Sequence, residues 1–443
     1  MIKRIKNKIN VLRADPHMQE VVRGTLLAFI LKIVGSGLAF AFNVAVARLL
    51  GAEGSGVYFL AISITAIGSV VGRVGLDNAL LRYIATHATL GEWAKVYGIH
   101  AVGMRLAICI STPLSLLGFF TADWIAIVIF NKPELGEPLR WMSLSILPFS
   151  VLNLQAESLK GLKRIRDAML IQGIGVPLVC LIMIWPLANL AGVVGLSWAY
   201  LAATLLVAMA GTWLWHGAAR GIESEKSSPL LKEVWASCKP LYVIALMNAV
   251  LSWAPLLLLG IWATSAEVGI YGAATRLAIL VSFLLVTLNN VIAPKFAELY
   301  ARGDIAAMGQ TARRSAAILI VLVGPLFIGL FFFSTEVMQL FGKEFGAGSV
   351  MLSVLLLGQL VNVITGSVGF LLMMSGNECS SRDITIGAAL LQLVLVLLLA
   401  PKMGGLGAAI ASATAMAVMN LVTVYVVYKK LGIITIPGLN KLL

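Results

Sequence analysis

Twelve apolar windows run through this 443-residue chain, and each is about the length of one membrane-crossing helix. Hydrophobic residues make up 60% of the chain and charged residues only 12%, whereas soluble domains carry about 25%. A soluble globular protein is therefore excluded. The windows predict an all-α polytopic membrane protein with twelve transmembrane helices and almost no extramembrane domain. They are 24–46, 57–81, 96–120, 139–159, 168–190, 194–216, 237–262, 268–293, 315–334, 348–374, 384–400 and 405–428.

The positions of the basic residues indicate the orientation of these helices. Of the 33 Lys and Arg residues, 24 lie in the N-terminal segment or on its side of the membrane, five in the opposite loops and four within windows. Both termini are therefore predicted to be cytoplasmic. The protein is predicted to lie in the cell inner membrane. Most of the +13 net charge is explained by topology, so nucleic acid is not an expected partner. The first window is too long for a signal-peptide core, carries Lys32 and lacks an A-x-A cleavage site, which favours an uncleaved span.

The chain lacks the sequence signatures of an enzyme or a metalloprotein. It contains no nucleotide-binding glycine motif, zinc-protease motif or nucleophile elbow. Its four cysteines are scattered, which is typical of packed thiols rather than of a metal site or a disulfide framework. They are Cys109, Cys180, Cys238 and Cys379. We predict no catalytic residue, no metal and no cofactor.

The two halves of the chain carry an internal repeat. Gly56-Val57-Tyr58 recurs as Gly269-Ile270-Tyr271, 213 residues later, and further pairs follow in chain order at offsets of 212 to 216. Six helices per half give both halves the same orientation, as two six-helix bundles related by a pseudo-two-fold along the membrane normal. The predicted divisions are a cytoplasmic basic N-terminus (1–23), an N-terminal bundle (24–216), a cytoplasmic linker (217–236), a C-terminal bundle (237–430) and a cytoplasmic C-terminus (431–443).

Four cations lie inside the predicted helices, namely Lys32, Arg73, Arg105 and Arg276. Each costs about 2.5 to 3.5 kcal/mol to insert, so they are expected to line a wet cavity or to pair with acids. Only Asp77 lies comparably deep, one turn after Arg73 and so on the same helix face. A cavity with an excess of cations selects anions, and arginine can hold a phosphate or diphosphate with two parallel hydrogen bonds.

Polar side chains at helical spacing predict a central cavity drawn from both halves. The predicted lining consists of Ser36, Asn43, Ser69, Asp77, Asn248, Ser252, Asn290, Gln359 and Asn362, and the boundary residues Arg82 and Lys295 are predicted to gate it. The alternatives are structural. They are an intrahelical ion pair for Arg73 with Asp77, snorkelling to the interface for Lys32 and Arg105, and interhelical hydrogen bonds for the uncharged residues.

Four segments carry a resemblance to a known family. They are ARLLGAEGSGVYFLAISITAIGSVVGRVGLDNALLRYIA (47–85), SLKGLKRIRDAMLIQGIG (158–175), AEVGIYGAATRLAILVSFLLVTLNNVIAPKFAELYARGD (266–304) and LLLGQLVNVITGSVGFLLMMSGNE (355–378). The chain resembles the polysaccharide transporters of Wzx type, lipid-linked oligosaccharide flippases of the multidrug/oligosaccharidyl-lipid/polysaccharide exporter superfamily. The family's cationic lining matches by residue type and span at Lys32, Arg73, Arg105 and Arg276.

This resemblance implies two six-helix bundles in a V, around a cationic cavity. It implies alternating access that moves an undecaprenyl-diphosphate-linked oligosaccharide from the cytoplasmic to the periplasmic leaflet, for O-antigen, capsule or exopolysaccharide synthesis. The implied partners are the polyprenyl-diphosphate-linked glycan, membrane lipids, and glycan polymerase and chain-length proteins. Relatives that flip the peptidoglycan precursor usually have fourteen spans, so twelve windows favour the polysaccharide branch.

Two alternatives stay open at this point. A cation-coupled multidrug exporter of the same superfamily would need acidic residues in its cavity, where only Asp77 is deep enough. An integral-membrane glycan polymerase or ligase would need a sizeable outer loop or paired catalytic groups. The longest predicted outer loop, about 120–138, is short.

Overall fold

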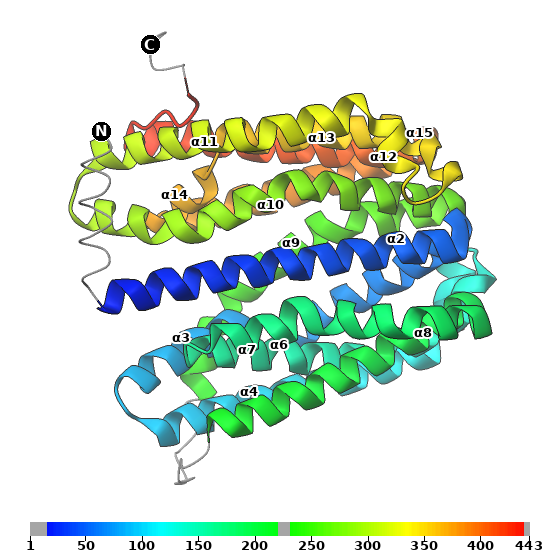
Figure 1. Cartoon of the computed structure of the whole chain (residues 1–443), viewed down its shortest axis with the longest axis horizontal. Coiled ribbons are helices and arrows are strands. Elements are labelled where there is room, and N and C mark those ends of the chain that lie inside the picture. The colour runs from blue at the N-terminus through cyan, green and yellow to red at the C-terminus, as the bar shows by residue number, and fades with distance from the viewer. Residues whose placement is uncertain (1–15, 220–230, 438–443) are drawn as a thin grey trace.

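A computed structural model describes residues 16–219 and 231–437 of the chain. Every regular element in these two ranges is a helix (Figure 1). The all-α class predicted from the apolar windows is therefore confirmed. The predicted N-terminal, linker and C-terminal segments lie partly outside the described residues, at 1–15, 220–230 and 438–443.

We call residues 16–219 the N-terminal half and residues 231–437 the C-terminal half. The N-terminal half contains α2 (Pro16–Arg73), α3 (Leu76–Thr89), α4 (Trp93–Trp124), η1 (Ile125–Ile129), η2 (Pro133–Leu135), α5 (Gly136–Ser143), α6 (Ile146–Gly161), α7 (Ile165–Met169), η3 (Leu170–Gly175) and α8 (Val176–Ala218). The C-terminal half contains α9 (Leu231–Trp262), α10 (Ser265–Ala301), α11 (Ile305–Phe332), α12 (Ser334–Met338), η4 (Lys343–Gly348), α13 (Ser349–Thr365), α14 (Val368–Met374) and α15 (Glu378–Leu431).

Eight helical stretches of the described residues are long and apolar enough to cross a membrane, so the chain is a multi-pass membrane protein. Three of them exceed 40 residues, about twice what a bilayer needs. Each of the three leaves helical geometry at a glycine with positive φ, namely Gly51, Gly192 and Gly404. The chain reverses direction at these glycines. Near Gly192, for example, it returns so closely that a Cβ added to Gly195 would overlap the carbonyl oxygen of Leu187. Eight residues of continuous helix would instead separate these two positions by about 12 Å.

Three predicted spans are interrupted. The window 139–159 is divided between α5, which ends at Ser143, and α6, which begins at Ile146. The other two interruptions lie at residues with positive φ. The window 57–81 is not one helix, because Val74 (φ 48°) and Gly75 (φ 75°) separate α2 from α3. The window 348–374 is divided between α13 and α14 at Gly366 (φ 72°). A backbone with positive φ cannot continue a right-handed helix, so hydropathy alone overestimates the length of these spans.

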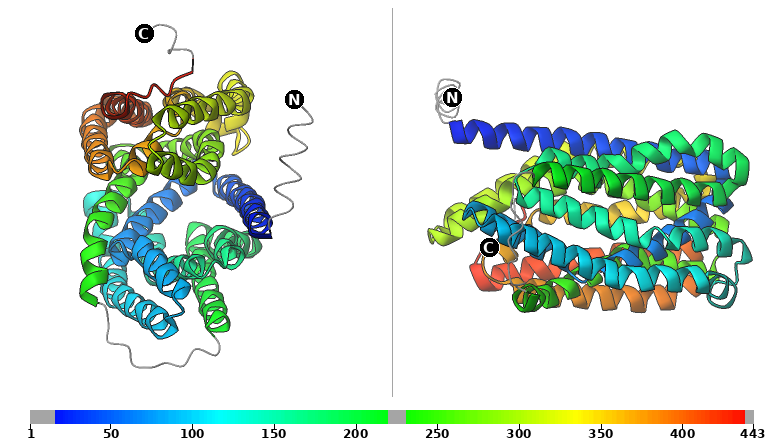
Figure 2. Two further views of the ribbon diagram at one scale, coloured as in Figure 1. Left: turned by 90° about the vertical axis from the view of Figure 1, so that its left-hand side faces the viewer. Right: turned by 90° about the horizontal axis from the view of Figure 1, so that it is seen from below.

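The helices gather in two groups that follow the two halves of the chain (Figure 2). Helices α3 to α8 lie on one side and α10 to α15 on the other, while α2 and α9 pack against members of both groups. Large apolar side chains cover the outside of the molecule. Phe120, Leu190, Trp213, Val321 and Phe332 are each more than 70% exposed. Such an apolar surface is expected of helices that face lipid.

Candidate substrate cavities

The end of the molecule that carries the predicted outer loops, which we call the outer end, is closed where two helices cross at glycines. The second arm of α2 meets the start of α10 there. A Cβ on Gly56 would overlap the carbonyl oxygen of Ser265, and a Cβ on Gly269 would overlap that of Ala52. Gly269 follows Gly56 by 213 residues, and Ser265 follows Ala52 by the same number. The contact is therefore reciprocal at the repeat offset, with the close backbone approach that small residues permit in membrane helices.

Two glutamates reinforce the closed outer end with the same reciprocity. Glu134 in η2 accepts a hydrogen bond from Ser265 Oγ at 2.9 Å. Glu344 in η4, 210 residues after Glu134, accepts one from the backbone N–H of Ala52 at 2.6 Å. Each carboxylate thus reaches from one half to the start of a helix in the other half, where the helix dipole favours negative charge.

Lys132 adds a third bond across the outer end. Its Nζ donates to the carbonyl oxygens of Gly260 and Ala263, both at 2.8 Å, at the C-terminal end of α9. A cation is favourable at the negative end of a helix dipole. Burial lowers the pKa of Lys132, and the nearby Glu134 carboxylate opposes that shift. The two halves are therefore joined at the outer end by main-chain contact, carboxylates and a buried lysine.

A central cavity of about 470 Å³ lies inward of this closure, between the two halves. The N-terminal half contributes lining residues from α2, α6, η3 and α8, and the C-terminal half from α9 and α10. Its polar and aromatic lining residues include Asn43, Tyr58, Phe149, Gln172, Tyr200, Ser252, Trp253, Tyr271, Thr275 and Arg276.

Arg276 is the charged residue of the central cavity. Its Nε donates to Asn43 Oδ1 at 2.7 Å, across the two halves, and one terminal nitrogen donates to the Gly272 carbonyl at 3.2 Å. The guanidinium carbon lies 4.1 Å from the centre of the Phe59 ring, a cation–π contact. Within the described residues no Asp or Glu forms an ion pair with Arg276. The arginine is thus held in place while part of its five-donor fork is left for an anion.

Tyr58 brings a second polar group to this cavity. The side chain is 1% exposed, and its hydroxyl has no hydrogen-bond partner in the part of the chain that the structure describes. Tyr271, its counterpart in the repeat, instead shares a hydrogen bond with Ser412 Oγ at 3.0 Å. Buried hydroxyls are normally paired, so the Tyr58 hydroxyl is an exception in the wall of this cavity.

An inner cavity of about 460 Å³ adjoins the central one and shares Ala39 and Gln172 with it. Lys32 and Lys160 both line it. Lys160 Nζ donates to Glu157 Oε1 and Gln172 Oε1, each at 2.7 Å, whereas Lys32 forms no ion pair within the described residues. Two lysines therefore border the space that leads to the central cavity.

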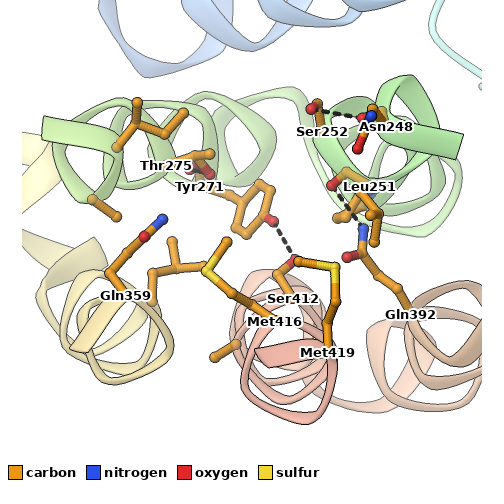
Figure 3. Close-up of a pocket in the computed structure, with 15 residues that line it drawn as sticks. Asn248, Leu251, Ser252, Tyr271, Thr275, Gln359, Gln392, Ser412, Met416 and Met419 are labelled. Carbon is orange, nitrogen blue, oxygen red and sulfur yellow. Dashed lines mark hydrogen bonds between the residues drawn. The ribbon is translucent and has the colours of Figure 1, made fainter. Parts of the chain in front are cut away.

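A third cavity, of about 280 Å³, lies within the C-terminal half and is called the C-half pocket (Figure 3). It is surrounded by α9, α10, α13 and α15, and it shares four lining residues with the central cavity. None of its described lining residues is charged. The shared residues are Ser252, Tyr271, Thr275 and Ile279.

Several residues predicted from the sequence lie around these cavities. Those of the central cavity are Asn43, Ser252 and Arg276, those of the inner cavity are Lys32 and Ser36, and those of the C-half pocket are Asn248, Ser252 and Gln359. Other predicted lining residues lie elsewhere. Ser69 is fully buried and shares a hydrogen bond with Ser150 of α6 at 3.1 Å. Asn362 donates to Gln359 Oε1 at 3.4 Å, and the side chain of Asn290 lies outside what the structure describes.

Arg73 and Asp77 are paired, with 3.4 Å between Nε and Oδ1. The expectation that they share the face of one helix is wrong, because Arg73 ends α2 and Asp77 lies in the first turn of α3. Neither lines the three cavities.

Three other predicted cations also lie away from the cavities. Arg105 on α4, Arg82 on α3 and Lys295 on α10 are all exposed. Lys295 Nζ donates to Glu298 Oε2 at 2.8 Å.

Sequence reasoning missed several residues of these cavities, among them Lys160, Gln172 and Gln392. Lys160 follows the predicted window 139–159, but α6 extends to Gly161 and carries it. Gln172 and Gln392 lie in the apolar windows 168–190 and 384–400. A lone amide inside an apolar run was the signal that could have found both, because such groups are expensive in lipid.

The chain thus places membrane-crossing helices around connected cavities. Among the solved structures that share this fold are two membrane transport proteins. One is an inward-facing multidrug resistance transporter of the MATE family in the MOP superfamily, with a TM-score of 0.77, 14% identity, and coverage of 92% of this chain and 98% of that one. The other is the lipid II flippase MurJ in an inward closed conformation, with a TM-score of 0.74, 15% identity, and coverage of 92% and 87%.

The sequence comparisons identify the family. A probable low-salt glycan biosynthesis flippase, Agl15 of Haloferax volcanii, is 24% identical over 95% of this chain and 88% of that protein. Residues 45–347 match the family model described as polysaccharide biosynthesis protein. The chain belongs to this polysaccharide biosynthesis family, and the predicted family is confirmed. Agl15, MurJ and the MATE protein are named as flippases and transporters rather than as enzymes.

Proposed function

We propose that the chain is a flippase for a lipid-linked oligosaccharide carried on a polyprenyl diphosphate. The observation that carries the proposal is Arg276, which stands between the halves with free N–H groups and, among the described residues, no acidic partner. A guanidinium can bind two diphosphate oxygens through parallel charge-assisted hydrogen bonds. Membership of a polysaccharide biosynthesis family and likeness to a glycan flippase support the same assignment.

Lys32 gives the anionic head group a first contact on the way to Arg276, whereas the charge of Lys160 is offset by its ion pair with Glu157. Both lysines line the inner cavity, which adjoins the central one at Ala39 and Gln172. Cations of one sign along a low-dielectric cleft attract a charged substrate and raise its local concentration. The diphosphate and glycan then enter between the halves, while the polyprenyl chain stays in the lipid.

The proposed transport cycle is alternating access between two six-helix bundles. The proposed count of twelve spans, six per half, treats α2, α8 and α15 as two spans each, divided at their glycines, and α5 with α6 as one interrupted span. The closed outer end corresponds to an inward-facing state, and separation at Gly56 and Gly269 would open it. An inside-negative potential favours outward movement of an anion by about 2.3 kcal/mol per charge per 100 mV. A coupling ion is therefore not required.

The finer assignments follow from this cycle. We propose that both termini are cytoplasmic and that the protein works in the cell inner membrane, on the basis of the Lys and Arg distribution. We propose undecaprenyl as the carrier and a surface polysaccharide (O-antigen, capsule or exopolysaccharide) as the product. A glycan polymerase and chain-length proteins would then act on the translocated substrate.

The cavities and the sequence comparison argue against the two alternative functions. A cation-coupled multidrug exporter needs acidic groups for a cationic substrate, yet no Asp or Glu lines the three cavities in the described part of the chain. The likeness to a MATE transporter concerns the fold alone. A polymerase or ligase is disfavoured because the relative that aligns along nearly the whole chain, Agl15, is named as a flippase.

Deletion of the gene in its own host tests the proposal. We expect lipid-linked oligosaccharide to accumulate in the cytoplasmic leaflet and surface glycan to be lost, measured by lipid extraction and mass spectrometry. The wild type and Arg314→Ala, a change at an exposed arginine on α11, should restore export. No accumulation in the deletion strain would contradict the flippase assignment.

A further inference from the structure

We infer that the C-half pocket holds one uncharged sugar of the substrate, the sugar bonded to the diphosphate. This inference rests on the proposed flippase function and adds the class of sugar that the site accepts. It derives from three features of the pocket: its connection to the Arg276 cavity, its hydrogen-bonding groups and its neutrality.

The connection places a sugar beside the diphosphate. Thr275 lines both cavities, and the next residue on α10, Arg276, lines the central cavity and bonds Asn43 of the other half. Ser252 and Tyr271 are also shared by the two cavities. The part of a substrate that is bonded to a group at Arg276 can therefore occupy the C-half pocket. At about 280 Å³ the pocket is near the lower end of the range for small-molecule sites, roughly 300 to 1,000 Å³, and suits a single sugar ring.

The hydrogen-bonding groups match hydroxyl or acetamido substituents. Gln392 is 3% exposed, and its Nε2 donates to the Leu251 carbonyl at 2.9 Å, which leaves its Oε1 without a partner among the described residues. Gln359 is 7% exposed, and its Oε1 accepts a hydrogen bond from Ser282, which leaves its Nε2 unpaired within the same part of the chain. The pocket thus offers one acceptor and one amide donor, and a sugar hydroxyl can pair with either.

The remaining surface of the pocket matches the apolar face of a sugar ring. Figure 3 shows the Tyr271 ring between the two glutamines, with Met416 and Met419 beside it. The Tyr271 hydroxyl is occupied by Ser412. The ring is therefore fixed in place by a bond that does not involve the ligand, and it forms part of the apolar wall of the pocket. A few polar groups set in a mostly apolar wall are typical of small-molecule sites.

The neutrality of the pocket selects against an acidic sugar. No charged residue occurs among its described lining residues, and Arg276 is already held toward Asn43 and Phe59. A uronate or phosphate group would lose its hydration there without a counter-charge, which is costly in an apolar surrounding. The site thus separates the substrate into an anionic head at Arg276 and a neutral sugar in the C-half pocket.

Binding to the purified full-length protein tests the inference with three probes. They are a polyprenyl diphosphate without sugar, the same lipid with one N-acetylglucosamine, and the same lipid with one glucuronic acid. We expect the N-acetylglucosamine probe to bind about tenfold more tightly than the bare lipid, as two neutral hydrogen bonds allow. The glucuronic acid probe should gain nothing over the bare lipid. Equal affinity of the wild type for the bare and N-acetylglucosamine probes would overturn the inference.

Variants test whether the tighter binding of the N-acetylglucosamine probe arises in the C-half pocket. Gln392→Ala should remove the tenfold gain and leave the affinity for the bare lipid unchanged, whereas Gln310→Ala, at an exposed glutamine on α11, should change neither. Asn248→Ala, at an exposed lining residue, is expected to reduce the gain and covers the case that Gln392→Ala does not fold. A loss that is equal for all three probes would overturn the inference.

Arg276→Ala separates the two proposals. This substitution should weaken the binding of all three probes to a similar degree, because all three carry the diphosphate. If Arg276→Ala leaves the bare lipid unaffected while the sugar gain persists, the diphosphate assignment fails and the sugar pocket stands.

Discussion

The two halves of the chain are alike at the outer end and different in the centre. At the outer end Gly56 and Gly269 make reciprocal contacts, and Glu134 and Glu344 bond corresponding positions of the opposite half. In the centre the likeness ends. Arg276 lies 213 residues after Ser63, a buried serine whose hydroxyl bonds the Phe59 carbonyl at 2.6 Å.

Under the proposed transport cycle, this difference separates the parts of the protein that move from the parts that contact the substrate. A closure that opens by motion of two similar bundles needs equivalent contacts on both sides, so the repeat is kept there. The proposed substrate, with a charged head and a neutral sugar, has no symmetry, and the site proposed for it departs from the repeat. Departures from a repeat are therefore a guide to substrate contacts in a chain of this kind.

The largest effect should come from the position where the halves differ most. Arg276→Ala is expected to lower transport at least thirtyfold, because a hydrogen-bonded charge contact of this kind is worth about 2 to 5 kcal/mol. Arg276→Lys should retain part of the activity, since it keeps the charge and loses the fork. Ser63→Ala, at the corresponding position, should change transport less than about twofold. Export rates normalised to membrane level measure all three, and an equal loss at both positions would contradict the comparison.

The second effect concerns the position where the halves agree. Gly56→Val and Gly269→Val should each force the helices apart at the outer end and bias the protein towards an outward-open state. In a cysteine-free background, Ser252→Cys in the central cavity should then react faster with a membrane-impermeant thiol reagent added outside. Gly324→Val on α11 is the matched control, because nothing lies within 4 Å of a Cβ there. Faster labelling with one glycine variant alone would show that the closure is not symmetric.

The smallest effect on transport is expected at Arg73 and Asp77, which lie outside the cavities. Arg73→Ala should lower thermal stability because it leaves Asp77 unpaired in a largely buried site, at a cost of up to about 3 kcal/mol. The double variant Arg73→Ala with Asp77→Ala should recover most of that stability and should transport nearly normally. Melting temperature and export rate are the readouts. If the stable double variant exports no glycan, the pair contacts the substrate and the cationic site extends beyond Arg276.

Sequence reasoning predicted the all-helical fold and part of the site because both depend on local polarity. Arg276 and Lys32 were found because a cation in an apolar window is conspicuous. Arg276 lines the central cavity and Lys32 lines the inner cavity. The pairing of Arg73 with Asp77 was also found, although the helix is broken between them. In this chain the two side chains meet across the break, between the end of α2 and the first turn of α3.

The remaining features depend on contacts between distant residues, which hydropathy does not contain. Lys160 falls outside the predicted window 139–159 because windows of apolar residues do not report where a helix extends past its apolar part. The C-half pocket needs Tyr271 and Ser412 to meet across 141 residues. Ser69 has the spacing of a lining residue, yet its hydroxyl points to Ser150. Periodicity identifies a polar face of a helix but not the neighbour that it meets.

The central claim, that Arg276 carries the diphosphate across the membrane, is tested most directly in proteoliposomes. A fluorescent polyprenyl diphosphate that bears a short neutral glycan is placed in both leaflets, and a membrane-impermeant quencher reports movement between leaflets. Wild-type protein should make the inner-leaflet pool accessible to the quencher, and Arg276→Ala should reduce that rate to the level of empty liposomes while Arg314→Ala has no effect. Equal rates with the wild type and Arg276→Ala would contradict the account.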